Sequence, residues 1–193
     1  MYKKINPKNI IVNMQGAIIV EFVFVVFITT LFIKILLSVS EYYSTVGKLD
    51  RISYSLVGVV RERTRLYNND NVLTQAQVNE IKKLADSMLA NSHYPQTDLA
   101  IKIETIHFRH TDSSEIENRH IDDEKSFSFN IGVCEPDESL NELSQLSSFS
   151  LAGRWIPLYQ VTLCLPTTPW YRVLFKSRGN IAPIKSSSIA MER

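Results

Sequence analysis

The sequence predicts an α+β fold in which one long amino-terminal helix and a second, shorter helix pack on a small antiparallel sheet. Three observations predict it. An apolar run over residues 17–39 has the length of a membrane-spanning helix. Residues 74–90 repeat apolar side chains at helical spacing, and apolar residues alternate along several segments after residue 99, as is typical of strands. The length of 193 residues allows one domain of ordinary size beside the long helix.

Composition and motifs argue against several classes of function. The chain carries 21 Lys and Arg against 20 Asp and Glu, so it lacks the basic excess with which nucleic-acid-binding proteins neutralise phosphates. It has no Cys-x-x-Cys, no Gly-rich phosphate loop and no Gly-x-Ser-x-Gly. His107, His110 and His120 lie near acidic residues, but their spacing does not fit a strand-borne metal site. We therefore expect no enzyme activity, no cofactor and no metal.

The run from Ala17 to Val39 is predicted to cross a bilayer as a helix. As a helix it is roughly 34 Å long, enough for a hydrocarbon core of about 30 Å. Three lysines precede it and no acidic residue does, so the positive-inside rule keeps the amino terminus in the cytoplasm and sends the rest outward. These basic residues are Lys3, Lys4 and Lys8.

Two ionisable side chains interrupt this run, and they differ in cost. Lys34 lies near the outer end, where its long stem reaches the headgroups. Glu21 lies about 6 Å inside the run, where a carboxylate costs on the order of 1 to 3 kcal/mol unless a partner offsets it. Cleavage between Gly16 and Ala17 would create such a partner, because the new α-amino group of one subunit can meet Glu21 of a neighbour.

Two other fates of the amino terminus stay open at this point. Ser38-Val39-Ser40 is a small-x-small triplet that an ordinary signal peptidase accepts, although the preceding apolar core is longer than usual and contains charges. The run could also remain as an uncleaved anchor. The first residue of the mature protein distinguishes the three cases, since it is Ala17 after pilin-type cleavage, Met1 without cleavage and Glu41 after ordinary secretion.

Beyond the membrane, the helix is expected to continue to about Tyr67. Apolar or small residues recur at helical spacing, and no proline lies between Pro7 and Pro95. The expected organisation is a leader over residues 1–16, a transmembrane helix over 17–39, an amphipathic continuation over 40–67 and an α+β head over 68–193. The stripe of the continuation consists of Val46, Leu49, Ser53, Leu56, Val60 and Tyr67.

The head is expected to contain one helix and several strands. Thr74 and Gln77 form a capping-box pattern at the start of a helix that should end near Ala90. Strands with one buried face are predicted within 99–108, with a bulge, and within 127–133 and 155–163. Edge strands are predicted at 171–175 and 181–189, because Pro183 confines the second of these to an edge. Loops are expected over 113–125 and 135–153, the latter with a helical turn at 140–146.

Cys134 and Cys164 each end a predicted strand. Alternation points both side chains away from the apolar faces of their strands, so they can share one side of the sheet. A disulfide closing a loop of about 30 residues would stabilise the head by roughly 3 to 4 kcal/mol. The alternative is a pair of buried thiols.

The combination of basic leader, Gly16, Ala17 and Glu21 resembles the class III signal of type IV pilins and pseudopilins, which a prepilin peptidase cuts. Residues 47–67, GKLDRISYSLVGVVRERTRLY, resemble the post-membrane signature of TadF-type pseudopilins, minor components of the tight-adherence (Tad or Flp) pilus system. Residues 154–164 and the Ser-rich carboxyl end are also similar to that family. Major Flp pilins carry Glu-Tyr after the cut and are far shorter, whereas this chain has Glu21-Phe22 and keeps 193 − 16 = 177 residues.

The resemblance implies a pilin-like fold and a non-enzymatic role in assembling the Tad pilus. It implies an inner-membrane protein with a periplasmic head that either enters the pilus or stays at its base. The implied partners are a prepilin peptidase, a TadE-like pseudopilin, the Flp pilin, the Tad inner-membrane machinery and the lipid bilayer. A membrane-anchored periplasmic binding or adhesion module that joins no filament remains the alternative. A periplasmic hydrolase on a membrane stalk would need a nucleophile and a base that the sequence does not offer.

Overall fold

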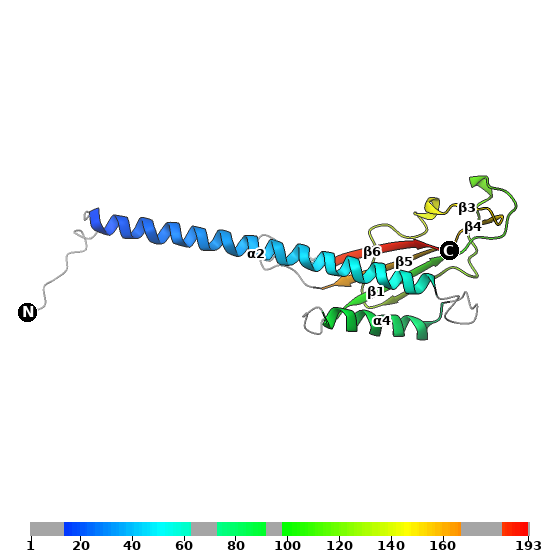
Figure 1. The fold of residues 1–193 in the computed structure, drawn as a ribbon, viewed down its shortest axis with the longest axis horizontal. Coiled ribbons are helices and arrows are strands. Elements are labelled where there is room, and N and C mark those ends of the chain that lie inside the picture. The colour runs from blue at the N-terminus through cyan, green and yellow to red at the C-terminus, as the bar shows by residue number, and fades with distance from the viewer. Residues whose placement is uncertain (1–13, 63–72, 92–97, 167–182, 193) are drawn as a thin grey trace, which may run out of the picture. The chain divides into compact units, whose positions relative to one another are not determined.

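The computed structural model describes residues 14–62, 73–91, 98–166 and 183–192, and it has the predicted α+β fold (Figure 1). Two long helices accompany a four-stranded antiparallel sheet with the strand order β2-β1-β5-β6. Contacts divide the chain into two compact units, one holding α2 up to Tyr43 and the other beginning at Ser44. The second unit, which we call the head, contains the sheet. The elements are α2 (Met14–Arg61), α4 (Gln75–Ala90), β1 (Ala100–Ile106), β2 (Phe127–Ile131), β5 (Leu158–Leu165) and β6 (Ile184–Met191).

Helix α2 runs without a break from Met14 to Arg61. Within the head its buried side chains include Leu49, Ser53, Leu56 and Val60, as the helical stripe predicts. The expected continuation from residue 63 to Tyr67 lies outside the described residues.

Helix α4 begins and ends where the sequence predicts. Its N-cap Thr74 accepts a hydrogen bond from the backbone N–H of Gln77 at 3.4 Å, and the Gln77 side chain accepts one from the backbone N–H of Thr74 at 3.1 Å. This reciprocal pair satisfies donors that the first turn of a helix otherwise leaves without partners. The buried face of α4 consists of Val78, Ile81, Ala85 and Leu89.

The predicted bulge in β1 is wrong. Strand β1 pairs with β2 from Ile101 to Thr105 and with β5 from Ala100 to Ile106, both without a break in register. Thr105 and Ile106 are both buried although they point to opposite faces of the sheet. The apolar alternation of this segment changes phase between Ile103 and Ile106 because both faces of the sheet are covered at this end, while the backbone stays regular.

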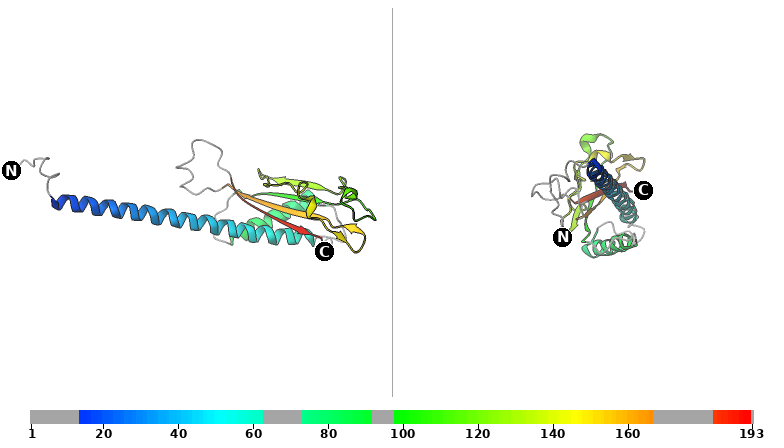
Figure 2. Two further views of the ribbon diagram at one scale, coloured as in Figure 1. Left: turned by 90° about the horizontal axis from the view of Figure 1, so that it is seen from above. Right: turned by 90° about the vertical axis from the view of Figure 1, so that its left-hand side faces the viewer.

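The prediction that each strand buries one face is also wrong for β5, because all eight of its residues are buried. Both helices cover one face of the sheet (Figure 2). The segment 132–143, which we call the strap, crosses the other face. A central strand covered on both sides buries its polar residues as well, and Gln160 and Thr162 of β5 are 2% and 0% exposed.

Strand β2 is shorter than predicted. It ends at Ile131 because Gly132 has a φ of 83°, in the left-handed region that favours glycine. A Cβ added at Gly132 would lie 2.8 Å from the Cβ of Ala100, so the close approach of the strap to β1 also requires glycine. Val133, predicted on the buried face of this strand, is 91% exposed.

The alternation predicts that Trp155 shares a strand with Tyr159, but Trp155 belongs to a separate hairpin. The hairpin pairs β3 (Phe149–Ser150) with β4 (Arg154–Trp155). The rings of Phe149 and Trp155 pack edge to face with their centroids 5.4 Å apart. The predicted helical turn at 140–146 is present and includes the 3-10 helix η2 (Ser144–Leu146), and a second 3-10 helix, η1 (Ile116–Asn118), lies in the first loop.

The carboxyl-terminal edge strand is present, but it runs from Ile184 to Met191, whereas the prediction is 181–189. Strand β6 forms one edge of the described sheet, and Pro183 directly precedes it. The other predicted edge strand, residues 171–175, lies outside the described residues.

Candidate functional site: an exposed apolar helix surface and a clamped head

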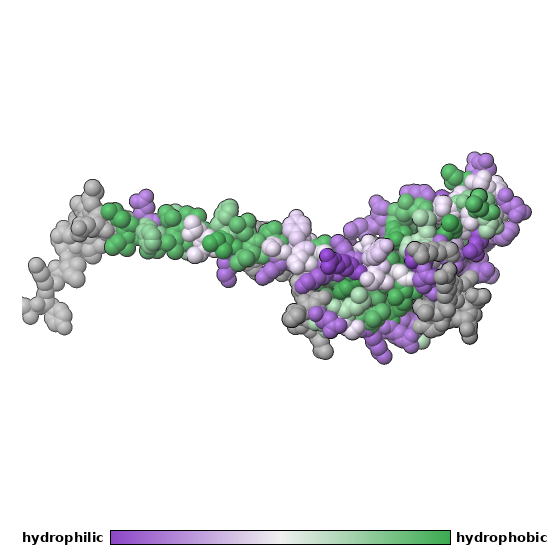
Figure 3. Space-filling view, in the orientation of Figure 1, coloured by the Kyte–Doolittle hydropathy of each residue, from purple (hydrophilic) through white to green (hydrophobic). Residues whose placement is uncertain are grey.

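The first half of α2 exposes almost every large apolar side chain that it carries. Its mean hydropathy reaches 2.6 and only 6% of its most apolar window is buried, so α2 is long and apolar enough to cross a membrane. Figure 3 shows this surface in green. The exposed residues include Ile18, Ile19, Val20, Phe22, Val23, Phe24, Val25, Val26, Phe27, Ile28, Leu31, Phe32, Ile33, Leu36 and Leu37.

The hydroxyl groups within this surface are satisfied by the helix itself. Thr29 donates to the carbonyl oxygens of Val25 and Val26 at 3.0 and 2.9 Å, and Thr30 donates to that of Phe27 at 2.9 Å. A polar group without a partner costs several kcal/mol in hydrocarbon, and these bonds remove that cost. The segment therefore suits a lipid environment despite its two threonines.

Glu21 is the exception on this surface. It is exposed, and it is the only charged residue between Ile18 and Ile33. Ile18 and Val25, three residues before it and four after, share its side of the helix and are 67% and 52% exposed. No ion pair to Glu21 occurs among the described residues, so a cation that offsets its charge in lipid has to come from elsewhere.

The predicted cleavage residues Gly16 and Ala17 lie in the first turn of α2, which begins at Met14. Their side chains, and the predicted leader lysines Lys3, Lys4 and Lys8, lie outside the described part of the chain. Lys34 is exposed one and a half turns before Val39, as an interfacial lysine would be.

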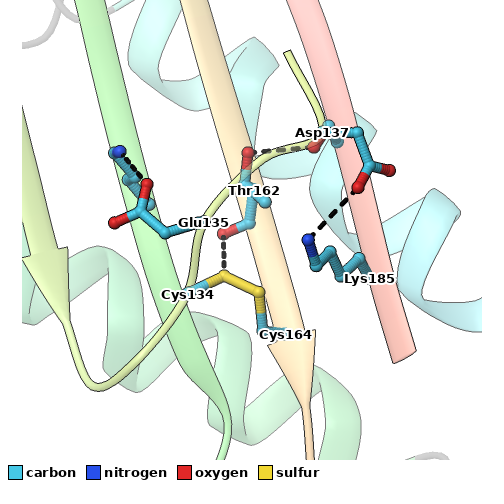
Figure 4. The surroundings of a disulfide bond; sticks show 8 residues. Cys134, Glu135, Asp137, Thr162, Cys164 and Lys185 are labelled. Carbon is cyan, nitrogen blue, oxygen red and sulfur yellow. Dashed lines mark hydrogen bonds and ion pairs between the residues drawn. A yellow bond between two sulfur atoms is a disulfide. The ribbon is translucent and has the colours of Figure 1, made fainter. Parts of the chain in front are cut away.

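The two cysteines form the predicted disulfide. Cys134 and Cys164 are joined with their Cα atoms 5.4 Å apart, and each is 1% exposed (Figure 4). Alternation along β5 correctly points Cys164 away from Val161 and Leu163. Cys134, however, lies in the strap beyond the end of β2, and it reaches β5 by crossing over the small side chain of Ala100.

The strap is held at several further points across the sheet. Glu135 forms an ion pair with Lys102 on β1, and Asp137 forms one of 3.2 Å with Lys185 on β6. The backbone carbonyl of Glu138 accepts a hydrogen bond of 3.3 Å from Gln160 on β5. Figure 4 shows the strap crossing in front of β1 and β5 toward β6, while both helices lie behind the strands. Leu140 closes the apolar cluster with Ile106 and Leu158.

A polar seam joins α2 to β6 on the opposite face. The Ser186 hydroxyl donates to the Asp50 carboxylate at 2.6 Å, and the Ser53 hydroxyl lies 2.9 Å from that of Ser186 and 2.7 Å from that of Ser188. Ser53 and Ser186 are buried, so these bonds satisfy groups that water does not reach. The Ser-rich carboxyl end is therefore a structural strand that anchors the head half of α2.

The histidines do not come together as a metal site in the described part of the chain. No group of three or more metal-binding side chains occurs there. His107 is buried, with its ring centroid 6.0 Å from that of Tyr159, whereas the side chain of His110 is 76% exposed.

A helix long and apolar enough to cross a membrane, in one chain with a disulfide-clamped α+β head, is consistent with the class of single-pass, membrane-anchored, pilin-like subunits. The particular family is TadF. Its family model, described as "Putative tight adherence pilin protein F", matches residues 9–193, and the chain belongs to that family. No curated protein and no solved structure matches the chain. The family makes this a pilin-like protein of a Tad pilus system and indicates a structural, non-enzymatic role.

Proposed function

We propose that this protein is a minor pseudopilin needed for assembly of the Tad pilus. The observation that carries the proposal is the exposed apolar surface of α2 over residues 18–37, interrupted by the single carboxylate of Glu21, in a chain of the TadF family. Such a surface is stable in a bilayer and offers lateral packing to other pilin-like helices. The partners are a TadE-like pseudopilin and the Flp pilin, together with the Tad inner-membrane machinery.

A prepilin peptidase cuts the chain between Gly16 and Ala17. The bond lies in the first turn of α2, where backbone N–H groups have no partners within the helix and where unwinding costs least. Gly16 lowers the local helix propensity further, by about 1 kcal/mol relative to alanine. Both features favour the extended conformation that a peptidase needs.

Cleavage supplies the cation that Glu21 lacks. The new α-amino group of Ala17 lies at the positive end of the helix dipole, so it is itself stabilised by a carboxylate. As subunits pack side by side, Glu21 of one helix meets the amine of the next, and two charges that are costly in lipid offset each other. Subunits thus gain an electrostatic contact in addition to apolar packing.

The head lies in the periplasm and the amino terminus in the cytoplasm. The buried disulfide supports this orientation, because disulfides persist in oxidising compartments outside the cytoplasm. The lysines before the span support it as well, through the positive-inside rule.

Site-specific photo-cross-linking tests this function. A photoreactive residue in place of Val25, which lies on the Glu21 side of α2, is expected to capture another pilin-like subunit in piliated cells, because that side of the helix packs in the assembly. The matched control is the same residue in place of Tyr54, which is exposed on the head half of α2. Adducts with lipid alone at Val25, in cells that make normal pili, would instead favour an anchored binding module that joins no filament.

A further inference from the structure

The strap covers two buried side-chain oxygens, on neighbouring strands of the sheet, that have no hydrogen-bond donor among the described residues. Glu104 on β1 lies directly opposite Gln160 on β5, and both side chains point to the strap side of the sheet. The Glu104 side chain is 12% exposed and Gln160 is 2% exposed. Glu104 Oε2 and Gln160 Oε1 are both buried, and neither has a hydrogen-bond partner among the described residues. Leaving two such acceptors unsatisfied is costly and uncommon.

The strap also contacts the other polar atoms of the pair. Gln160 Nε2 donates to the backbone carbonyl of Glu138 at 3.3 Å, and the backbone N–H of Leu140 favours the charged form of Glu104 and so lowers its pKa. Reversing the Gln160 amide does not solve the problem, because its oxygen would then face the carbonyl of Glu138. The site is short of one donor in either orientation, and a proton on Glu104 provides it.

The charges around the site also favour a proton on Glu104. The ammonium of Lys102 lies 3.8 Å from the Glu104 carboxylate but also pairs with Glu135. Glu142 of the strap adds a further negative charge, and Lys185 on β6 is engaged by Asp137. The Lys102 ammonium thus lies close to two carboxylates, those of Glu104 and Glu135. Glu135 has 65% of its side chain exposed to water, whereas Glu104 Oε2 is buried, so we expect the proton to bind at Glu104.

We propose that Glu104 and Gln160 form a proton-binding site beneath the strap, in which protonated Glu104 donates to Gln160 Oε1 and thereby tightens the strap on the sheet. The head is then more stable in mildly acidic surroundings than in neutral ones. This inference concerns the head alone and does not depend on the proposed function.

The direction of the pH dependence follows from linkage. Burial raises the pKa of Glu104 above its ordinary value of 4.5, and the charges of Glu135 and Glu142 add to that effect, while Lys102 and the Leu140 N–H oppose it. Between its ordinary pKa and this raised one, the folded state binds more protons than the unfolded state. Stability therefore falls as the pH rises through the pKa of Glu104 in the folded protein, and it is recovered on acidification.

Thermal unfolding of the full chain in detergent micelles tests the proposal. Glu104→Gln places an N–H donor toward Gln160 and keeps an oxygen for the Leu140 N–H, so it mimics the protonated state. At pH 8 it is expected to melt above the unchanged protein by about 2 to 4 °C. That difference should shrink as the pH falls toward 5. The matched control is Glu117→Gln on the exposed helix η1, which removes the same charge and should leave the melting temperature unchanged at both pH values.

A second measurement keeps the proposal testable even if Glu104→Gln does not fold. Carbon-13 NMR of glutamate carboxyl groups follows the titration of Glu104 directly in the unchanged protein. Its midpoint should lie above 4.5. Glu135→Gln should lower that midpoint, because Lys102 is then free to pair with Glu104. A Glu104 midpoint at or below 4.5, or a Glu104→Gln effect of equal size at pH 5 and pH 8, would overturn the proposal.

Discussion

Replacing Glu21 with valine should leave membrane insertion intact and should reduce piliation severely. Valine makes the run from Ile18 to Ile33 wholly uncharged, so insertion becomes easier by about the cost of a carboxylate in lipid, on the order of 1 to 3 kcal/mol. The same change removes the group that the proposed assembly contact requires. Counting pili by electron microscopy, together with membrane fractionation of the variant, measures both effects.

Matched variants separate charge from shape at this position. Glu21→Gln keeps the size of the side chain and removes the charge, so it should behave like Glu21→Val. Glu21→Asp keeps the charge on a shorter stem and should retain part of the function. Lys34→Gln removes an ionisable group from the other end of the span and should leave piliation unchanged. Normal piliation of Glu21→Val would count against the charge pairing.

Removing the disulfide should have the largest effect on the stability of the head. The bond closes a loop with a sequence separation of 30 residues, and replacing both cysteines with alanine should cost roughly 3 to 4 kcal/mol of unfolding free energy. That is a large part of the about 5 to 15 kcal/mol that stabilises a typical domain. Urea denaturation of the full chain in micelles measures the loss.

The single variants Cys134→Ala and Cys164→Ala serve as controls for this experiment. Each breaks the same bond and should lose a similar amount, because the constraint on the unfolded chain disappears in both. Thiol labelling of the denatured, unreduced protein should find no reactive thiol. Two reactive thiols, or an unchanged urea midpoint in the double variant, would contradict the clamp.

Both helices could be predicted because their signals are local. The apolar run of α2 and the capping box of Thr74 and Gln77 each depend on residues within a few turns of one another. Glu21 could be singled out for a similar reason, because the free-energy cost of a carboxylate inside an apolar run is evident from the sequence alone. Its partner could not be seen on this chain, because in the proposed assembly the partner belongs to a neighbouring subunit.

The strap could not be predicted from local patterns. The strap covers β5 only because Gly132 turns the chain at the end of β2. Alternation alone predicts that this strand continues to Val133. Burial of both faces of β5 is therefore a consequence of a distant segment. The residues from Leu158 to Leu165 carry only a weak signal for a covered strand, because Gln160 and Thr162 alternate with apolar residues as they would in a half-exposed strand. The role of the β6 serines likewise becomes clear only from the hydrogen bond between Ser186 and Ser53.

The most direct test of the account is the identity of the first residue of this protein when it is isolated from piliated cells. Amino-terminal sequencing or intact mass should show that the chain starts at Ala17, with the α-amino group one helical turn from Glu21. A chain that still starts at Met1, or one that starts at Glu41, in cells with normal pili would contradict it.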